Sequence, residues 1–310
     1  MSDSVHVAMI ADRRAVLPLA VAMSGVTRGL TARTAHFHIL GVGLTAADRE
    51  QLERLVDPHR VSWLEPAEAE RLIAELPQIA HIPPISFTRL LLPALLPELD
   101  RVVYLDADMV VKADFGELWD QGTAGRSIAA VADPGMPTLA GAECMPYARE
   151  LVQDPEAQPF NAGMMLMDLR ACRERGVADR ALRFIRENLE RLSYADQDGL
   201  NFALEGDWHA LEMKWNVPIT LVNGPEPKDL PEVAAFNTKP AFSVPAVYHL
   251  FGGHKPWNSG PRHTLREAWL EELRVAGVIS EQDWPAWRRR DDRRARSFSI
   301  RKRLNRWVRL

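Results

Sequence analysis

Two aspartates one residue apart interrupt an apolar run and are the first candidates for chemistry. Residues 101–111, RVVYLDADMVV, are otherwise mostly β-branched or apolar. Side chains alternate between the two faces of a strand, so Asp106 and Asp108 would share one face, with Ala107 on the other. Neighbouring carboxylates repel unless a cation or several donors lie between them, and a hard divalent metal ion would serve both. The alternative is that both aspartates merely open a loop.

A second polar segment, YHLFGGHKPWNSG (248–260), has neither helical nor strand periodicity. His249 is a candidate metal ligand, although a lone histidine is usually structural. Gly252 lets the backbone approach an anion, and Lys255 supplies an ammonium group that would neutralise phosphate. The combination therefore favours a site for a metal and a phosphorylated ligand.

A third segment, QPFNAGMMLMDL (158–169), places Asn161, Ala162 and Gly163 just ahead of an apolar strand. Glycine allows close backbone approach, and the asparagine amide both donates and accepts hydrogen bonds. The alternative is a plain turn before a core strand.

A fourth segment, SYADQDGLN (193–201), groups Asp196, Gln197 and Asp198 at the start of a helical pattern. These side chains are candidates for ligand binding, but Asp196 alone is better explained as a helix N-cap.

The first half of the chain alternates strand and helix patterns that would position these groups. The apolar patterns predict strands over 5–11, 35–41, 60–65 and 101–105, and helices over 15–26, 45–56 and 85–99. Thr45 and Asp48 have the spacing of a capping box, and Pro93 would bend or break its helix. This βαβ rhythm predicts a parallel, doubly wound sheet.

Ligands of such sheets bind at the carboxyl ends of the strands. Asp12 and Asp106 each follow a predicted strand, so we expect both to face the ligand crevice. The segment 133–158 is predicted to be a loop or lid over this crevice, with Asp133 at its root.

The composition is that of an ordinary globular protein, with 310 residues, 46% hydrophobic and 26% charged. Cys144 and Cys172 are the only cysteines, which excludes a disulfide framework and a paired-cysteine zinc site and indicates a reducing cytoplasm. The apolar N-terminal stretch is interrupted by Asp12, Arg13 and Arg14, so we expect neither a signal peptide nor a membrane span there.

The charge is distributed unevenly along the chain. Residues 288–310 contain eleven Lys or Arg and two Asp, a net charge of +9, which leaves −13 for the rest of a chain whose total is −4. A basic amphipathic helix containing Trp is typical of a helix lying in a membrane interface. The alternative is a solvated or nucleic-acid-binding basic run, but an apolar face favours the membrane. That face would contain Ile300, Leu304, Trp307 and Val308.

The order and spacing of these motifs resemble the retaining glycosyltransferases of family 8, which include bacterial lipooligosaccharide galactosyltransferases and glycogenin-like enzymes. The resemblance covers roughly residues 5–260. It rests on Asp12 after the first strand, Arg89 in ISFTRL, the DxD motif in LDADMVV, FNAG, DQD, and HLFGGHKPW, which fits HxxGxxKPW.

The resemblance implies a GT-A fold, a Rossmann-like mixed sheet flanked by helices, over residues 1–260, followed by a helical extension over 261–310. Such a fold would bind a UDP-sugar with Mn²⁺ or Mg²⁺. By motif position, Asp106, Asp108 and His249 would ligate the metal, and Lys255 and Gly252 would hold the diphosphate.

The resemblance also implies the donor-sugar contacts and the catalytic group. Gln197 takes the position of the family's debated β-face group; because an amide is a poor nucleophile, we favour front-face attack by the acceptor with retention. Lys255 would stabilise the leaving diphosphate. The donor sugar would be held by Arg89, Asp196, Asn161, Ala162 and Gly163.

The nucleotide contacts would come from Ala11, Asp12, Arg14 and Ala107, and here the chain departs from the family. Relatives commonly carry an aromatic residue that stacks on uracil, where this chain has Arg14 and Ala15. Asp12 would still form a hydrogen bond with the uracil base, and the guanidinium group of Arg13 or Arg14 would stack on that base.

The implied activity is transfer of galactose or glucose from a UDP-sugar to a glycan acceptor, lipopolysaccharide or another cell-surface saccharide. The enzyme would be cytoplasmic, bound peripherally to the inner face of the membrane, with no nucleic-acid partner. A catalytically inactive glycan-binding module is disfavoured because the whole metal and phosphate set is present.

A second alternative is a haloacid-dehalogenase-like phosphatase, because LDADMVV also fits the DxDx[TV] pattern of that family. Those enzymes need the motif on the first strand and a later acidic pair, but here it falls on about the fourth strand. The only Asp-Asp pair, Asp291 and Asp292, lies in the basic tail.

Overall fold

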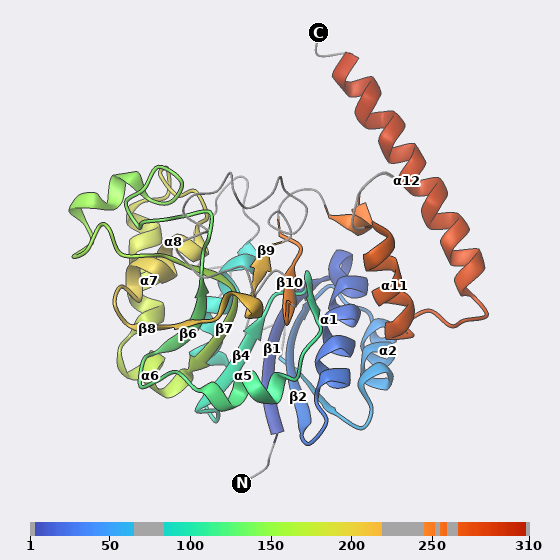
Figure 1. Cartoon of the computed structure of the whole chain (residues 1–310), viewed down its shortest axis with the longest axis horizontal. Helices are drawn as coiled ribbons and strands as arrows, with labels where there is room; N and C mark the ends of the chain where they lie inside the picture. The colour runs from blue at the N-terminus through green and yellow to red at the C-terminus, as the bar shows by residue number, and fades with distance from the viewer. Residues whose placement is uncertain (1–3, 65–83, 219–244, 252–254, 259–265, 308–310) are drawn as a thin grey trace.

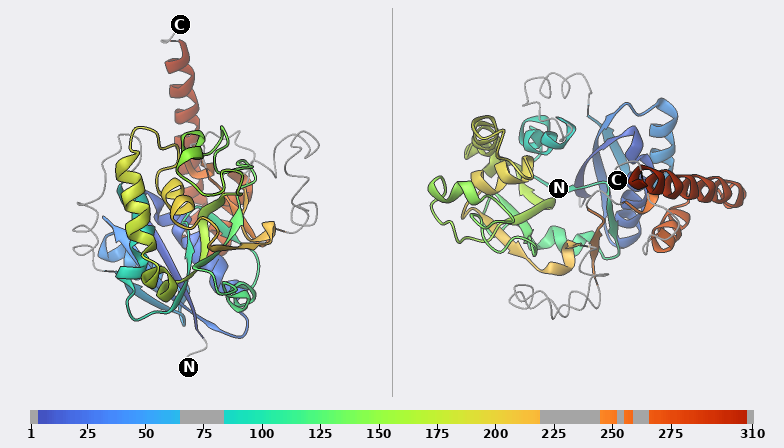
Figure 2. Two further views of the ribbon diagram at one scale, coloured as in Figure 1. Left: turned by 90° about the vertical axis from the view of Figure 1, so that its left-hand side faces the viewer. Right: turned by 90° about the horizontal axis from the view of Figure 1, so that it is seen from above.

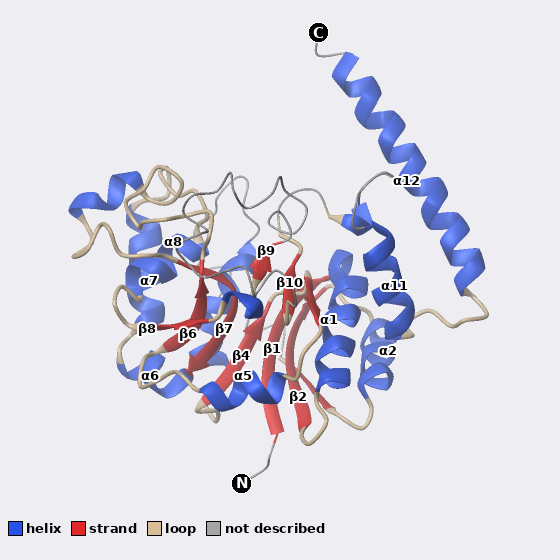
Figure 3. Cartoon of the chain, viewed as in Figure 1, coloured by secondary structure: helices blue, strands red, loops and turns tan. Residues whose placement is uncertain are grey.

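A seven-stranded mixed sheet forms the centre of the molecule (Figure 1, Figure 3). The computed structural model describes residues 4–64, 84–218, 245–251, 255–258 and 266–307, with side chains described as far as residue 297. The strand order is β3-β2-β1-β4-β7-β6-β8. The bounds are β1 Ser4–Asp12, β2 Thr34–Val42, β3 Arg60–Trp63, β4 Arg101–Leu105, β6 Ile128–Ala132, β7 Phe160–Asp168 and β8 Trp208–Leu211.

Strands β3, β2, β1 and β4 are parallel, as the alternation of the first half of the sequence predicts. Strand β7 runs antiparallel to both β4 and β6, and β8 pairs parallel to β6. The sheet is therefore mixed, with its parallel half nearer the N-terminus of the chain.

A small second sheet brings together segments that are far apart in the sequence. Its order is β5 (Met109–Val111), β10 (Val247–His249) and β9 (Val217–Pro218). The antiparallel register pairs His249 with Met109, and the amide of Leu250 donates to the carbonyl oxygen of Asp108 at 3.0 Å. His249 is thereby fixed beside the DxD segment.

The helices confirm most of the sequence-based expectations. The side chain of Thr45 caps the helix that follows it, and the capping box with Asp48 is formed. The helix predicted over 85–99 is wrong in type: a 3-10 helix covers Pro84–Leu91, and only Leu92–Leu95 is α-helical, with Pro93 in its first turn. The α-helices among the described residues are α1 Val16–Gly29, α2 Ala46–Val56, α4 Leu92–Leu95, α5 Phe115–Gln121, α6 Leu169–Glu174, α7 Val177–Glu187, α8 Asp196–Ala203, α11 Arg266–Ala276 and α12 Trp284–Trp307.

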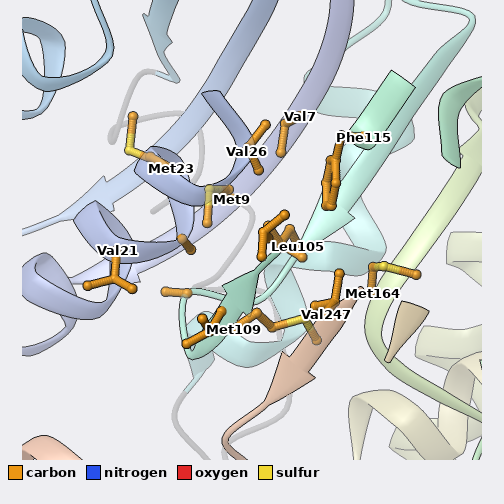
Figure 4. Packing of buried hydrophobic residues seen from close by; sticks show 14 of the residues in the cluster. Val7, Met9, Val21, Met23, Val26, Leu105, Met109, Phe115, Met164 and Val247 are labelled. Atoms are coloured by element: carbon orange, nitrogen blue, oxygen red, sulfur yellow. The ribbon is translucent and has the colours of Figure 1, made fainter. Parts of the chain in front are cut away.

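Buried side chains form one core on each face of the large sheet. Figure 4 shows the first, in which Val7 and Met9 of β1 pack with Val26 of α1 and Val247 of β10. Successive residues of a strand point to opposite faces, so Ala8 joins the second core, on the side of α6, α7 and α8. Both faces of the central strands are therefore buried.

Helix α12 projects away from the body, with the C-terminus at its far end (Figure 1, Figure 2). The first half of α12 is attached to the body through α11. The Nη2 group of Arg266 in α11, a residue that is 1% exposed, donates hydrogen bonds to the carboxylates of Asp291 and Asp292. An apolar face is predicted for this helix, but its side chains are not among those that the structure describes: Ile300, Leu304, Trp307 and Val308. No helix in the described part of the chain combines the length and apolarity needed to span a membrane.

Candidate active site

Two carboxylates and one imidazole converge where the two sheets meet. His249 Nε2 lies 3.4 Å from Asp108 Oδ1 and 3.9 Å from Asp106 Oδ2. One ligand atom from each residue lies within 4.8 Å of the others. The strand ends at Leu105 as predicted, but the argument from alternating strand faces is wrong, because a turn at residues 107–108 separates β4 from β5. The carboxylates converge because the chain passes there from the large sheet to β5 of the small one.

A chain of amide hydrogen bonds determines which nitrogen of His249 faces the carboxylates. Asn161 Nδ2 donates to Asp133 Oδ2 at 3.1 Å, which leaves Asn161 Oδ1 to accept from Asn216 Nδ2 at 2.9 Å. Asn216 Oδ1, at 3.0 Å from His249 Nδ1, must therefore accept a proton from that nitrogen. With the proton of a singly protonated ring on Nδ1, Nε2 would carry the lone pair that a metal ion between Asp106 and Asp108 needs.

Gly163 leaves the space that this cluster occupies. A Cβ atom there would lie 2.3 Å from His249 Cε1 and 3.0 Å from Asp106 Oδ2. The Gly163 carbonyl accepts from the amide of Asp106 at 2.8 Å, which ties β7 to the DxD turn. Residues 161–163 lie inside β7, so the alternative of a plain turn before the strand is wrong.

Lys255 adds a positive charge to the cluster. Its Nζ pairs with Asp108 Oδ2 and donates to the carbonyl of Leu250 at 2.7 Å. Burial alone would raise the pKa of Asp108, but His249 and Lys255 outweigh it and hold that pKa below its usual value. Asp108 is therefore ionised at neutral pH and available to a cation. Gly252, predicted to contact the diphosphate, lies outside the described residues.

Arg89 connects the DxD turn to α8. Its Nη2 lies 3.1 Å from Asp106 Oδ1, its Nε lies 2.9 Å from Asp196 Oδ2, and its Nη1 donates to the Ala162 carbonyl at 2.9 Å. Burial raises the pKa of Asp196 to about 6, although Arg89 acts in the opposite direction. The N-cap role for Asp196 is wrong, because the N-cap residue of α8 is Ala195, which makes no side-chain capping bond.

Gln197 is held by both ends of its amide. Its Oε1 accepts from the Ala162 amide at 3.0 Å, and its Nε2 donates to Asp133 Oδ2 at 3.4 Å. Asp133, 9% exposed, thus anchors both Asn161 and Gln197. Part of the predicted loop or lid over 133–158 belongs to the core, because Met136, Leu139 and Met145 are buried.

The end of β1 contributes a different surface. Asp12 Oδ1 accepts from the backbone amides of Arg14 at 2.8 Å and Ala15 at 3.2 Å, which caps a 3-10 turn over Arg13–Ala15. The exposed Arg14 lines a groove of about 570 Å³ together with Trp257, two residues beyond Lys255. Ala11 and Ala107, predicted nucleotide contacts, are buried.

Two residues of the site carry no signal in the sequence. Asn216 lies between the apolar residues Trp215 and Val217 and belongs to no motif, yet it orients His249. The sequence around Tyr104 indicates only a strand residue. Its hydroxyl nevertheless donates to Asp106 Oδ1 at 2.5 Å, and the Arg89 guanidinium lies 4.8 Å from the centre of its ring.

The phosphatase alternative finds no support in this arrangement. Asp106 and Asp108 follow β4, the fourth strand among the described residues, as the sequence predicts. Asp291 and Asp292, the acidic pair in the tail, bond Arg266 instead of joining the DxD turn.

Comparison with known proteins places this geometry in a family. The profile described as Glycosyl transferase family 8 matches residues 6–260. General stress protein A of Bacillus subtilis is 28% identical over 63% of this chain and 66% of its own length. Lipopolysaccharide 1,2-glucosyltransferase of Escherichia coli is 29% identical over 52% of this chain and 45% of its own. The chain thus spans less than two thirds of these two relatives.

Lipopolysaccharide 1,3-galactosyltransferase of Salmonella typhimurium is 25% identical over 87% of this chain and 78% of its own length. The solved structure of the galactosyltransferase LgtC with donor and acceptor sugar analogs has a TM-score of 0.69 and 22% identity, covering 90% of this chain and 99% of that one. This likeness shows the GT-A fold. Because the family profile covers most of the sequence, the chain belongs to glycosyl transferase family 8.

Proposed function

We propose that this protein is a metal-dependent, retaining hexosyltransferase that moves galactose or glucose from a UDP-sugar to a glycan acceptor. The observation that carries the proposal is the cluster of Asp106, Asp108 and His249, with Lys255 paired to Asp108. Family membership supports the reaction class. The relatives named as lipopolysaccharide glucosyl- and galactosyltransferases support a lipopolysaccharide or another cell-surface saccharide as the acceptor.

The three candidate metal ligands, two carboxylates and one imidazole, fit Mn²⁺ or Mg²⁺. Two carboxylates suit a hard ion, and one neutral imidazole favours Mn²⁺ over Ca²⁺. Asp106, Asp108 and His249 would hold the ion, and its positive charge would stabilise the diphosphate that leaves. Lys255, which pairs with Asp108 in this structure, would supply its ammonium group to the same leaving group.

Residues around Arg89 would hold the donor sugar. Arg89 joins Asp106 and Asp196, and Asn161, Ala162 and Gly163 lie at the adjoining end of β7. The donors and acceptors of these groups suit sugar hydroxyls. Ala11, Asp12, Arg14 and Ala107 would contact the nucleotide, with the Arg14 guanidinium plane covering the base in place of an aromatic ring.

The state of Gln197 supports front-face transfer. Its oxygen already accepts from the Ala162 amide and its nitrogen donates to Asp133, and an amide is a poor nucleophile. The carbonyl dipole of Gln197 can stabilise positive charge at the reacting carbon while the acceptor hydroxyl attacks from the face of the leaving group. The product then keeps the α configuration of the donor.

A panel of UDP-sugars with Mn²⁺ tests the proposal. We expect release of UDP and an α-linked product, seen by mass spectrometry and NMR, with UDP-galactose or UDP-glucose, and no turnover in excess EDTA. Release of inorganic phosphate instead would support the phosphatase, and binding without turnover would support the inactive module. A β-linked product would exclude retention.

A further inference from the structure

Three histidines form a second cluster of possible metal ligands on the large sheet, separate from the candidate active site. His6 belongs to β1, and His36 and His38 belong to β2. The parallel register pairs His6 with His36 and Ala8 with His38. Because residues two apart on a strand share a face and paired residues lie side by side, all three imidazoles project from one face of the sheet.

The three rings are close enough to share one ion. One ring nitrogen from each lies within 4.8 Å of the others. His6 Nδ1 and His38 Nε2 are 2.9 Å apart, and the centres of the His36 and His38 rings are 4.3 Å apart. Two nitrogens on a tetrahedral zinc ion lie about 3.3 Å apart, for Zn–N bonds of about 2.0 Å. The closest pair therefore needs to separate by only a few tenths of an ångström.

The chemistry of the surroundings favours neutral rings. Burial, followed by His36, His6 and Arg60, lowers the pKa of His38 to about 3. Burial and Arg101 lower the pKa of His6, and burial, His6 and Arg60 lower that of His36. A neutral imidazole has one nitrogen with a lone pair for a metal. His6 Nδ1 and His38 Nε2 share a hydrogen bond, so the donating ring must carry its proton on its other nitrogen when the ion binds. The two arginines weaken the attraction for any cation.

The position of the cluster separates it from the active-site groups. His6 precedes Asp12 by six residues of the same strand, which is about 20 Å at the rise of a β-strand. The cluster therefore lies toward the amino ends of the parallel strands, whereas Asp12 lies at the carboxyl end.

Ser62 of β3 orients one of the three rings, because its Oγ lies 2.7 Å from His36 Nε2.

We propose that His6, His36 and His38 bind a zinc ion that links β1 to β2. Three imidazoles without a carboxylate suit a borderline-soft ion such as Zn²⁺ and do not suit Mg²⁺ or Mn²⁺. His6 and His36 are half-buried and His38 is 6% exposed, so one side of the ion stays open to water or a small anion. An ion bound only by the folded chain stabilises it.

The test needs a protein in which the active-site cluster cannot supply the signal. The full-length Asp108→Asn protein loses one carboxylate of that cluster and keeps all three histidines. Calorimetric titration with Zn²⁺ in excess Mg²⁺ should show one equivalent bound, and the melting temperature should rise with Zn²⁺. Adding His38→Gln should weaken binding at least tenfold, and adding His209→Gln, an exposed histidine of β8, should leave it unchanged.

A spectroscopic measurement keeps the proposal testable if the His38→Gln protein folds poorly. X-ray absorption at the zinc edge of the Asp108→Asn protein should show three imidazole ligands. One imidazole, which would be His249, or no zinc binding at all would overturn the proposal. Equal affinity in the His38→Gln and His209→Gln proteins would overturn it too. None of these outcomes depends on transferase activity.

Discussion

At the scale of single residues, the tautomer of His249 follows from groups that do not touch the carboxylate pair. Asp133 can only accept when ionised, so the direction of each hydrogen bond from Asp133 through Asn161 and Asn216 to His249 is fixed. The sequence indicates His249 as a ligand, but it cannot indicate Asn216, because the contact joins residues 33 positions apart.

Replacing Asn216 by leucine should therefore weaken the proposed metal site, although all three ligand residues are kept. Loss of the acceptor at Nδ1 frees the ring to rotate or to change tautomer, and partners of this kind contribute about 10- to 100-fold in metal affinity. We expect the Mn²⁺ concentration for half-maximal turnover to rise by at least tenfold. Asn188→Leu, at the end of α7, is the matched control. An unchanged Mn²⁺ dependence would contradict the role of Asn216.

Lys255 and a metal ion should compete for Asp108. The ammonium group already pairs with this carboxylate, so Lys255→Met should raise the affinity for Mn²⁺ alone by about tenfold, as expected for removing a unit charge from a partly buried cluster. The same change should lower the affinity for UDP, because a phosphate partner is lost. Calorimetry with each ligand separately measures both effects. Parallel weakening of Mn²⁺ and UDP binding would show that Lys255 supports the metal site instead.

At the scale of elements, α8 contains a buried carboxyl group that should make stability depend on pH. Asp198 Oδ2 accepts from the amides of Ser193 and Tyr194, while Oδ1 has no partner among the described residues. Burial raises the pKa of Asp198 to about 6 against these hydrogen bonds, from an ordinary value near 3.8. The folded state thus binds the proton more tightly than the unfolded state between about pH 4 and pH 6.

The free energy of unfolding should therefore fall as pH rises through this window. Asp198 contributes at most about 3 kcal/mol to this fall in the free energy of unfolding, because its pKa differs by about two between the folded and unfolded states. Asp198→Asn should remove this share of the slope, whereas Asp179→Asn, at an exposed position of α7, should leave the slope unchanged. Urea unfolding at several pH values measures it. The same slope in both variants would show that Asp198 does not ionise in this range.

The elements also show what periodicity can and cannot predict. The pattern of the first half correctly predicts β1 to β4, and the Thr45 capping box is local enough to be recognised from four residues. The strand over 101–105 is predicted correctly, but the apolar residues that follow the aspartates belong to a second sheet, which the pattern does not show. That sheet forms only by pairing with β10, far along the chain, so no local pattern reveals it.

At the scale of the whole molecule, the attachment of α12 separates two roles within the basic tail. Asp291 and Asp292 hold the buried Arg266, so these residues belong to the body. Replacing both by asparagine should cost about 3 kcal/mol of stability or more, because a buried charge loses its partners. Arg296→Gln, at an exposed position of the same helix, serves as the control in a urea titration. A cost below about 1 kcal/mol would contradict this role.

For the remainder of the tail, the sequence predicts a contact with an anionic membrane. Deleting residues 298–310 removes five Lys or Arg and leaves Asp291 and Asp292 in place. Each cation near an anionic leaflet contributes about 1 kcal/mol at most. The truncated protein should keep its melting temperature and its transfer to a soluble acceptor, but it should no longer sediment with anionic liposomes. Equal sedimentation of both forms would contradict a membrane role for the tail.

The central claim is that Asp106, Asp108 and His249 bind a metal ion that in turn holds the diphosphate of the nucleotide. Titration calorimetry with UDP measures this directly, in Mn²⁺ and in excess EDTA, for the natural chain and for Asp108→Asn. The natural chain should bind UDP in Mn²⁺ and lose at least tenfold in affinity in EDTA, whereas Asp108→Asn should bind weakly in both. Equal UDP affinity of the natural chain with and without the metal would contradict the claim.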